Sequence, residues 1–398
     1  MERKKLLLKG RLITPEGISR ENCLLETDGS IISQIAEMGA LFPGSSHVVH
    51  NFGPCYICPG FIDIHVHGCG GADVMDPLPE SLEKMSEWLA RGGTTGFLAT
   101  TMSAPREMLA GAVRKAAAFR IGRFRGAKVL GVHMEGPFLN PEKKGAQKEE
   151  YLRLPSIAEL KEYIEAGRGA VKMITLAPEL PGSIEVIRYA RSNGLVVSLG
   201  HSGASITQVA EACDMGLTHV SHAFNAMTGF HHREPGTTGA IMSMKRLTVD
   251  VIADGHHVHP SIIKILIRAK GIQNTIAITD CISGGGMGDG IYTLGGQRVT
   301  VRDGATFLDD GTIAGSTISM AVAVKVLVEQ VGLDLGEAMQ MVSANPARLL
   351  GLDTKGALVT GNDADIVVLD HEFRVLMTIV EGEIVYRVMA RGGGSAGC

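Results

Sequence analysis

Two histidines at alternate positions of one short apolar segment are the clearest indication of chemistry in this sequence. The segment FIDIHVHG contains His65 and His67, and Asp63 has the same parity. Alternate side chains of a β-strand point to one face, so these three groups would lie together. Two imidazoles on one face can bind a divalent cation. The same pair could instead face solvent or be hydrogen-bonded within a core.

Four later apolar segments end in residues of the same chemical types. They are Glu135 in GVHMEGP, His201 in VVSLGHS, His222 in HVSHAFN and Asp280 in AITDC. Imidazoles and carboxylates together suit Zn²⁺ or Fe²⁺, and their chance occurrence at five segment ends is improbable. We therefore predict a metal centre built from these residues and the first histidine pair.

Neighbouring histidines and cysteines have more ordinary interpretations. His133 has the parity of Glu135, and it either supports the metal ligands or is simply hydrogen-bonded inside the fold. His219 is expected to pack within its strand. Cys69 and Cys281 stand close to the predicted ligands in the sequence, and no ligand role is assigned to them.

The predicted ligands require a fold that brings several strand ends together. From Pro59 onward, short apolar runs alternate mostly with helix-length amphipathic segments, which is the βαβα pattern of a parallel sheet covered by helices. Eight such runs predict an α/β fold, a (β/α)₈ barrel of the TIM type over residues 56–350. The carboxyl ends of barrel strands meet at one mouth, where the six predicted ligands would converge.

The two ends of the chain resemble each other in pattern. Residues 1–55 and 351–390 both contain short apolar runs separated by turns, so we predict one small discontinuous β-sandwich domain beside the barrel. Residues from about 320 to 350 predict helices. The glycine-rich segment at 284–290 predicts a mobile loop near the mouth, and residues 391–398 predict a flexible tail.

Composition limits the partners that the protein could have. The 398-residue chain has a formal net charge of −4, which argues against nucleic acid as a partner. No apolar run approaches the roughly 18 residues needed to cross a bilayer, and the apolar run near the start is too short for a signal peptide. Seven cysteines in a long chain favour reduced thiols, so a cytoplasmic location is expected.

Motifs along nearly the whole chain resemble those of the amidohydrolase superfamily, and within it the N-acetylglucosamine-6-phosphate deacetylases. The motifs are PGFIDIHVHG, GTTGFLATT, HMEGPFLNPEKKGAQ, SLGHS, SHAFNAM, HHREPG, VIADGHH, ITD, IAGS, NPARLLG and DADIVVLD. The first and last of these fit many amidohydrolases, whereas the central motifs are specific to the deacetylases.

This resemblance implies a ligand set for the metal. Glu135, His201 and His222 look like the ligands of the main divalent metal, Zn²⁺ or Fe²⁺, with Asp280 close to it. Some family members lack the pair found here as His65 and His67 and hold one metal, whereas others keep it and can hold two. One or two metals per subunit are therefore expected, the second bridged by Glu135 and a hydroxide. Other superfamily members bridge with a carboxylated lysine.

The resemblance also implies contacts to a small phosphosugar. Asn225 and the Ala226 backbone look like phosphate ligands, and Arg233 resembles the guanidinium that reaches the phosphate from a neighbouring subunit, which makes a homodimer expected. His257 matches the histidine that polarises the substrate. The remaining expected substrate contacts are Ala146, Gln147, Ile313, Ala314 and Gly315; some relatives have His in place of Gln147.

The activity implied by the resemblance is hydrolysis of N-acetyl-D-glucosamine 6-phosphate to D-glucosamine 6-phosphate and acetate, in amino-sugar catabolism. Asp280 would transfer the protons and His257 would stabilise the oxyanion. Two alternatives remain open at this point. One is an amidohydrolase that cleaves cyclic amides or N-acyl amino acids, and the other is a barrel that senses amino-sugar phosphates without catalysis.

Overall fold

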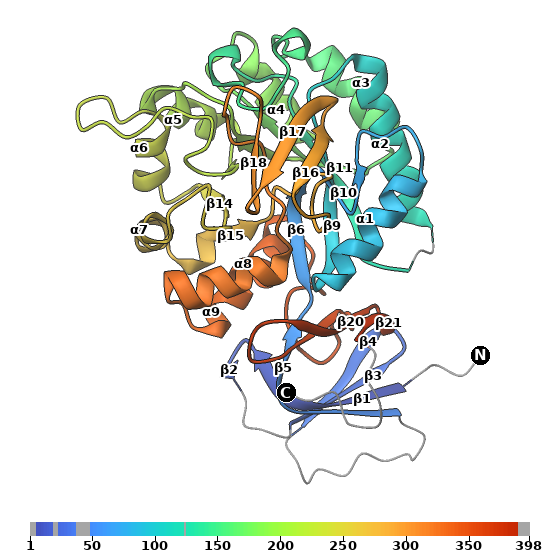
Figure 1. Cartoon of the computed structure of the whole chain (residues 1–398). Helices are drawn as coiled ribbons and strands as arrows, with labels where there is room; N and C mark the ends of the chain where they lie inside the picture. The colour runs from blue at the N-terminus through green and yellow to red at the C-terminus, as the bar shows by residue number, and fades with distance from the viewer. Residues whose placement is uncertain (1–4, 19–22, 37–47, 123–124, 389–398) are drawn as a thin grey trace.

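The structure is a computed structural model that describes residues 5–18, 23–36, 48–122 and 125–388. It contains a barrel and a smaller sheet below it in the view of Figure 1. The predicted tail at 391–398 lies outside the described residues. Among the described helices, none is both long and apolar enough to cross a lipid bilayer.

The barrel contains eight parallel strands, as the sequence predicts. In spatial order they are β15 (Thr275–Ile278), β14 (Thr248–Ile252), β13 (His219–Val220), β12 (Val196–Leu199), β11 (Val171–Leu176), β10 (Lys128–Glu135), β9 (Thr94–Thr101) and β6 (Phe61–Val66). The ring closes between its first and last strands, where Val66 forms a parallel bridge with Cys281 and the amide of Asp280 donates to the carbonyl of His65 over 2.9 Å. This closure places Asp280 beside the histidine pair.

Helices surround the barrel and pack on it through apolar faces (Figure 1). They are α1 (Glu80–Arg91), α2 (Arg106–Ile121), α3 (Ile157–Gly167), α4 (Ser183–Ser192), α5 (Ile206–Met215), α6 (Gly236–Ser243), α7 (Pro260–Lys270) and α8 (Met320–Val326). In α1, for example, Leu82, Met85 and Leu89 recur at helical spacing and are buried. A capping box between Ser205 and Gln208 starts α5.

The helical prediction for residues 320 to 350 is confirmed. After α8 the chain continues through the π-helical turn Leu327–Val331, α9 (Leu335–Met339), a second π-helical turn at Gln340–Ala344 and α10 (Asn345–Leu349). Ser343 in the second π-helical turn donates its hydroxyl to the carbonyl of Gly60, 3.0 Å away. This contact fixes the amino-terminal end of β6.

Both chain ends contribute to one small β unit, as predicted, and its strands form a single sheet. Its order is β21 (Glu383–Arg387), β20 (Val375–Val380), β19 (Ile366–Leu369), β5 (Val48–Pro59), β1 (Lys5–Thr14), β3 (Cys23–Asp28) and β4 (Ile31–Ala36), and β2 (Gly17–Ile18) pairs with β1. The amide of Ile32 in β4 donates to the carbonyl of Asn362 over 2.8 Å, so the sheet rolls over its own apolar core. A single rolled sheet therefore replaces the two facing layers of the predicted β-sandwich.

A second small sheet covers part of the barrel mouth. Its antiparallel strands β16 (Gly290–Leu294), β17 (Gln297–Arg302) and β18 (Ala305–Phe307) are inserted between β15 and α8. The predicted loop at 284–290 leads into β16 through turns. The sequence analysis did not predict this sheet, because its short strands alternate weakly. A short hairpin, β7 (Gly68–Cys69) with β8 (Ala72–Asp73), follows β6.

Candidate active site

The strand ends at the barrel mouth bring the six predicted metal ligands together. His65 and Glu135 lie in β6 and β10, and the other four side chains lie just after β6, β12, β13 and β15. All six are buried, with Asp280 the most exposed at 8%. Two overlapping groups have ligand atoms within 4.8 Å of one another: His65 with Glu135 and His222, and His65 with His67 and Asp280. The geometry therefore matches the cluster expected from the sequence.

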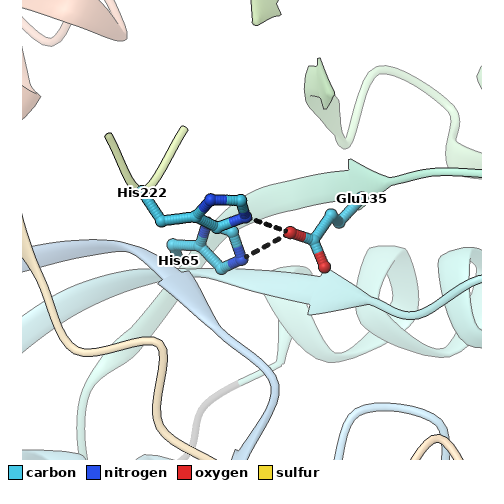
Figure 2. Close-up of side chains that lie close together, drawn as sticks. All are labelled: His65, Glu135 and His222. Carbon is cyan, nitrogen blue, oxygen red and sulfur yellow. Dashed lines mark hydrogen bonds and ion pairs between the residues drawn. The ribbon is translucent and has the colours of Figure 1, made fainter. Parts of the chain in front are cut away.

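One carboxylate oxygen lies at the centre of this cluster. Oε1 of Glu135 is 2.9 Å from Nε2 of His222, 3.2 Å from Nε2 of His201 and 3.3 Å from Nε2 of His65. Figure 2 shows His222 and His65 approaching it from the same side. A carboxylate oxygen does not need three imidazole partners to satisfy its hydrogen bonding. A shared cation fits this arrangement.

The second group lies between β6 and β15. Nε2 of His67 is 3.2 Å from Oδ1 of Asp280 and 3.4 Å from Oε2 of Glu135. The Nε2 atoms of His65 and His67 are only 3.2 Å apart. Either one of these nitrogens donates a proton to the other, or both lone pairs bind a cation held between them.

Backbone carbonyls fix the orientation of two of the imidazoles. Nδ1 of His201 lies 2.9 Å from the carbonyl of Lys143, and Nδ1 of His67 lies 3.2 Å from that of Thr100. A carbonyl oxygen can only accept, so both Nδ1 atoms carry hydrogen and both Nε2 lone pairs face the cluster. Metal-binding histidines are usually held in this way.

The electrostatic balance of the cluster favours added positive charge. Burial acts to lower the pKa of His222, but the hydrogen bond and charge of Glu135 outweigh it and raise that pKa to about 9. Burial acts to raise the pKa of Asp280, yet the imidazoles of His65 and His67 hold it at about 2. The pKa of Glu135 is likewise held well below its usual range, against burial, by His65 and His201. The donor set therefore fits a divalent cation.

Left-handed backbone conformations occur at three of the six residues. The φ angles are +49° at His201, +31° at His222 and +49° at Asp280. Residues with side chains adopt this region at a cost, and such residues gather at functional sites. Each one directly follows the end of its strand or lies just beyond it, where the turn redirects the side chain into the mouth.

Two further buried histidines, His133 and His219, have polar neighbours for their ring nitrogens. His133 contacts the carbonyl of Ile64 at 3.0 Å and the hydroxyl of Thr175 at 2.7 Å. Burial and the nearby His65 outweigh the charge of Glu135 and hold the pKa of His133 well below its usual range. His219 contacts Asp250 at 2.9 Å, as expected for a histidine packed within its strand, and Asp250 also accepts from the amide of His222.

A cavity of about 220 Å³ opens above the cluster and contains most of the predicted substrate contacts. Its walls include Ala146, Gln147, Asn225, Ala226, His257, Ile313 and Gly315. Ala314 is buried beside the cavity in the apolar cluster under the inserted sheet, and it does not line the wall. Arg233 is exposed and is 2.9 Å from Nε2 of His232, so within one chain it does not reach the cavity.

The structure gives Gln147 a partner that its sequence position does not indicate. Its Nε2 donates to Oε2 of Glu135 over 2.6 Å, while its Oε1 accepts from the amide of Ser103 over 2.8 Å. The side chain expected to touch sugar thus also holds the central carboxylate. Contacts between loops far apart in the sequence leave no local signal for such a partner.

Other lining residues were missed by the sequence analysis. Met102, Ile252, Leu294 and Thr312 line the cavity, and Asp254 holds His257 through a 2.7 Å contact to Nδ1. Asp254 stands three residues before His257, a spacing that could have suggested this pair. The apolar residues give no such signal because apolar side chains are usual at strand ends.

Comparison with known proteins gives consistent relatives. Residues 56–385 match the amidohydrolase family. The chain is 37% identical to an N-acetylglucosamine-6-phosphate deacetylase of Bacillus subtilis, with 83% of this chain and 84% of that protein covered. It is 38% identical to an N-acetylgalactosamine-6-phosphate deacetylase of Escherichia coli O157:H7, with 94% and 97% covered.

Solved structures agree with these relatives. A mutant N-acetyl-D-glucosamine-6-phosphate deacetylase from Mycobacterium smegmatis, in complex with N-acetyl-D-glucosamine-6-phosphate, superposes with a TM-score of 0.90 at 32% identity, covering 96% of this chain and 99% of that one. The enzyme of the same name from Thermotoga maritima gives a TM-score of 0.86 at 34% identity, with 96% and 100% covered.

Proposed function

This chain belongs to the amidohydrolase family, and we propose that it hydrolyses N-acetyl-D-glucosamine 6-phosphate to D-glucosamine 6-phosphate and acetate. The observation that carries this proposal is the cluster of Glu135 and four imidazoles at the floor of a cavity whose wall also contains Asn225 and His257. Relatives at 37% identity over most of the chain are deacetylases of that sugar phosphate.

The metal-binding roles follow the resemblance to the deacetylases, and the short distances to Glu135 support them. Glu135, His201 and His222 would hold one divalent cation, and His65 with His67 would hold a second that shares Glu135. Imidazole and carboxylate ligands suit Zn²⁺ or Fe²⁺. A bound divalent cation supplies a Lewis acid that polarises the acetyl carbonyl and makes water more acidic.

Asp280 is positioned to move the protons of the reaction. Its carboxylate is ionised at neutral pH, because nearby imidazoles outweigh the effect of burial and hold its pKa at about 2. It would accept a proton from water as the water oxygen bonds to the acyl carbon. When the carbon–nitrogen bond breaks, the same proton would pass to the departing nitrogen, so that a neutral amine leaves.

His257 is held ready to donate into the cavity. Burial acts to raise the pKa of Asp254, but the hydrogen bond from His257 outweighs it and lowers that pKa. Asp254 is therefore a carboxylate that can only accept, and Nδ1 of His257 donates to it. Oriented in this way, the His257 ring would stabilise an oxyanion on the substrate through its Nε2.

The phosphate would bind where Asn225 and the backbone of Ala226 line the cavity wall. Because Arg233 is exposed and outside the cavity of its own chain, we propose that it reaches the phosphate bound to a second copy in a homodimer. A planar guanidinium can contact two phosphate oxygens at once, which neutral groups alone cannot match in strength.

A second candidate substrate is N-acetyl-D-galactosamine 6-phosphate. A relative of that specificity is 38% identical over 94% of this chain, as similar as the glucosamine enzymes. The two sugars differ only in the orientation of one hydroxyl. The reaction, the metal ligands and the phosphate site would be the same for both.

Acetate release tests the function directly. Metal-loaded protein would be given N-acetylglucosamine 6-phosphate, N-acetylgalactosamine 6-phosphate and unphosphorylated N-acetylglucosamine. We expect the first to give the highest kcat/KM and the unphosphorylated sugar the lowest. Preference for N-acetylgalactosamine 6-phosphate would make that sugar phosphate the substrate. Equal turnover of N-acetylglucosamine with and without its phosphate would overturn the phosphate site. Turnover of a cyclic amide or an N-acyl amino acid instead would overturn the deacetylase assignment.

A further inference from the structure

A second cavity lies behind one wall of the candidate active site. It measures about 260 Å³, and Met102 lines both it and the active-site cavity. We propose that Met102 separates the two cavities and thereby sets the largest acyl group that the enzyme removes. This inference rests on the proposed deacetylase function and adds to it a determinant of substrate selectivity.

Met102 is close to the reacting centre. It follows β9 directly, and its side chain is 3% exposed. Its sulfur lies 3.5 Å from Nε2 of Gln147, and that nitrogen lies 2.6 Å from Oε2 of Glu135. The methionine is therefore separated from the central carboxylate by a single amide group.

The orientation of the substrate directs its acyl group toward an apolar wall. The acyl carbonyl must reach the metal ligands, and the sugar must extend toward Asn225 and Ala226 if its phosphate is bound there. The third substituent of the acyl carbon is the methyl group. It needs an apolar contact near Glu135, and Met102 provides one.

The second cavity offers room for a longer chain. Its lining includes the apolar side chains of Met75, Ala104 and Met108 beside polar ones, among them Lys148, Tyr151, Asp73 and Asp76. Aliphatic and thioether side chains suit an extended acyl chain of similar polarity. Removing the methionine side chain would join this space to the active-site cavity.

The inserted sheet supports Met102 from behind. Gly295, in the turn between β16 and β17, has a φ of +54°, and a Cβ atom there would lie 3.1 Å from Cβ of Met102. Leu294 and Ile282 pack in the same apolar cluster as Met102. This close packing holds the methionine in place, so the wall does not open simply by rotation of an exposed side chain.

The test compares acyl groups of increasing length on one sugar phosphate. N-Acetyl-, N-propionyl- and N-butyrylglucosamine 6-phosphate would be given to the wild type and to Met102→Ala. The wild type should prefer acetyl over propionyl by roughly 10- to 200-fold in kcat/KM, the range for one poorly fitted methylene, and should prefer acetyl over butyryl by more than that. Met102→Ala should reduce that preference at least tenfold, mainly through a lower KM for the butyryl compound.

Three further variants separate the wall from general loosening. Met102→Leu has similar volume and should retain the wild-type preference, and Met102→Val should give an intermediate preference if Met102→Ala fails to fold. Met108→Ala enlarges the second cavity without touching the first, so it should leave the preference unchanged.

Two results would overturn the inference. One is an unchanged acyl preference in folded, metal-loaded Met102→Ala, and the other is an equal broadening in Met108→Ala. Absence of acetate release by the wild type would instead overturn the deacetylase function, and this inference with it. Wild-type turnover of the acetyl compound therefore distinguishes the two failures.

Discussion

The two ends of the candidate substrate site are built from different kinds of structure. At the reactive end, buried side chains at strand termini surround Glu135, and backbone carbonyls orient two of the imidazoles. At the phosphate end, Asn225 is half-buried and Arg233 is exposed on the loop before α6. Neighbouring Phe230 is 66% exposed.

This difference shows that catalysis needs rigidly held side chains, whereas phosphate binding needs less rigid ones. Chemistry requires atoms held within a few tenths of an ångström, and strand ends in a closed barrel provide that. Phosphate binding depends on charge, which tolerates a longer and less constrained side chain. Changes at the reactive end should therefore act on kcat, and changes at the phosphate end on KM.

The largest effect is expected from Asp280→Asn. The amide has nearly the same shape but cannot accept the proton from water, so kcat should fall by about 10²- to 10⁴-fold. Steady-state kinetics and metal analysis would be done on the same sample. Normal metal content with near-normal turnover would remove Asp280 from proton transfer.

The next effect is expected from His257→Asn. Loss of a donor to the oxyanion should lower kcat by about 10²- to 10³-fold, with a smaller change in KM. Asp254→Asn should give a partial loss, because its amide keeps a contact to His257 without the negative charge. If Asp254→Asn had no effect on kcat, the role of that charge would be contradicted.

A smaller effect is expected from Arg233→Ala, and it should fall on KM. Loss of charge-assisted hydrogen bonds to phosphate should raise KM by about 10- to 100-fold while kcat changes little. Arg268→Ala, which removes an exposed arginine from α7, is the matched control and should change neither constant. An unchanged KM in Arg233→Ala would exclude the arginine from the phosphate site.

The proposed homodimer can be tested with the same variant, Arg233→Ala. Mixing Arg233→Ala with Asp280→Asn should restore part of the activity, since a mixed dimer has one site with both residues intact. Mixing would be followed by activity at fixed total protein. No recovery in proven mixed dimers would mean that Arg233 acts within its own chain or not at all.

The last expected effect concerns metal content, in the double variant His65→Ala, His67→Ala. Glu135, His201 and His222 remain to hold one cation, so metal analysis should show one equivalent lost per chain from a two-metal protein. Thermal melting would check that the barrel is intact. An unchanged metal content would establish a single site that does not use the histidine pair.

The sequence predicted the reactive end better than its surroundings. Alternation places His65 and His67 on one face, and a barrel brings its strand ends to one mouth, so the six ligands could be inferred before their distances were known. These ligands depend on local pattern and on a regular fold. That is why their positions agree with the prediction.

The remaining contacts depend on loops that meet only in three dimensions. Gln147 contacts Glu135 because the amide of Ser103, from another loop, orients its side chain. Met102 lines two cavities because the turn at Gly295 packs behind it. Neither relation has a periodic signal, and the inserted sheet itself consists of short strands with weak alternation.

The rolled sheet made from both chain ends also constrains the order of biosynthesis. Strand β5 lies between β1 and β19, and it leads through Gly60 into β6, which holds His65. The amide of Gly60 donates to the carbonyl of Asp365, just before β19. On the ribosome, β5 therefore keeps an open edge until almost the whole chain has emerged, and such edges promote aggregation. Premature termination anywhere before β19 would leave β5, the strand that leads into β6 and its histidine pair, without this neighbour.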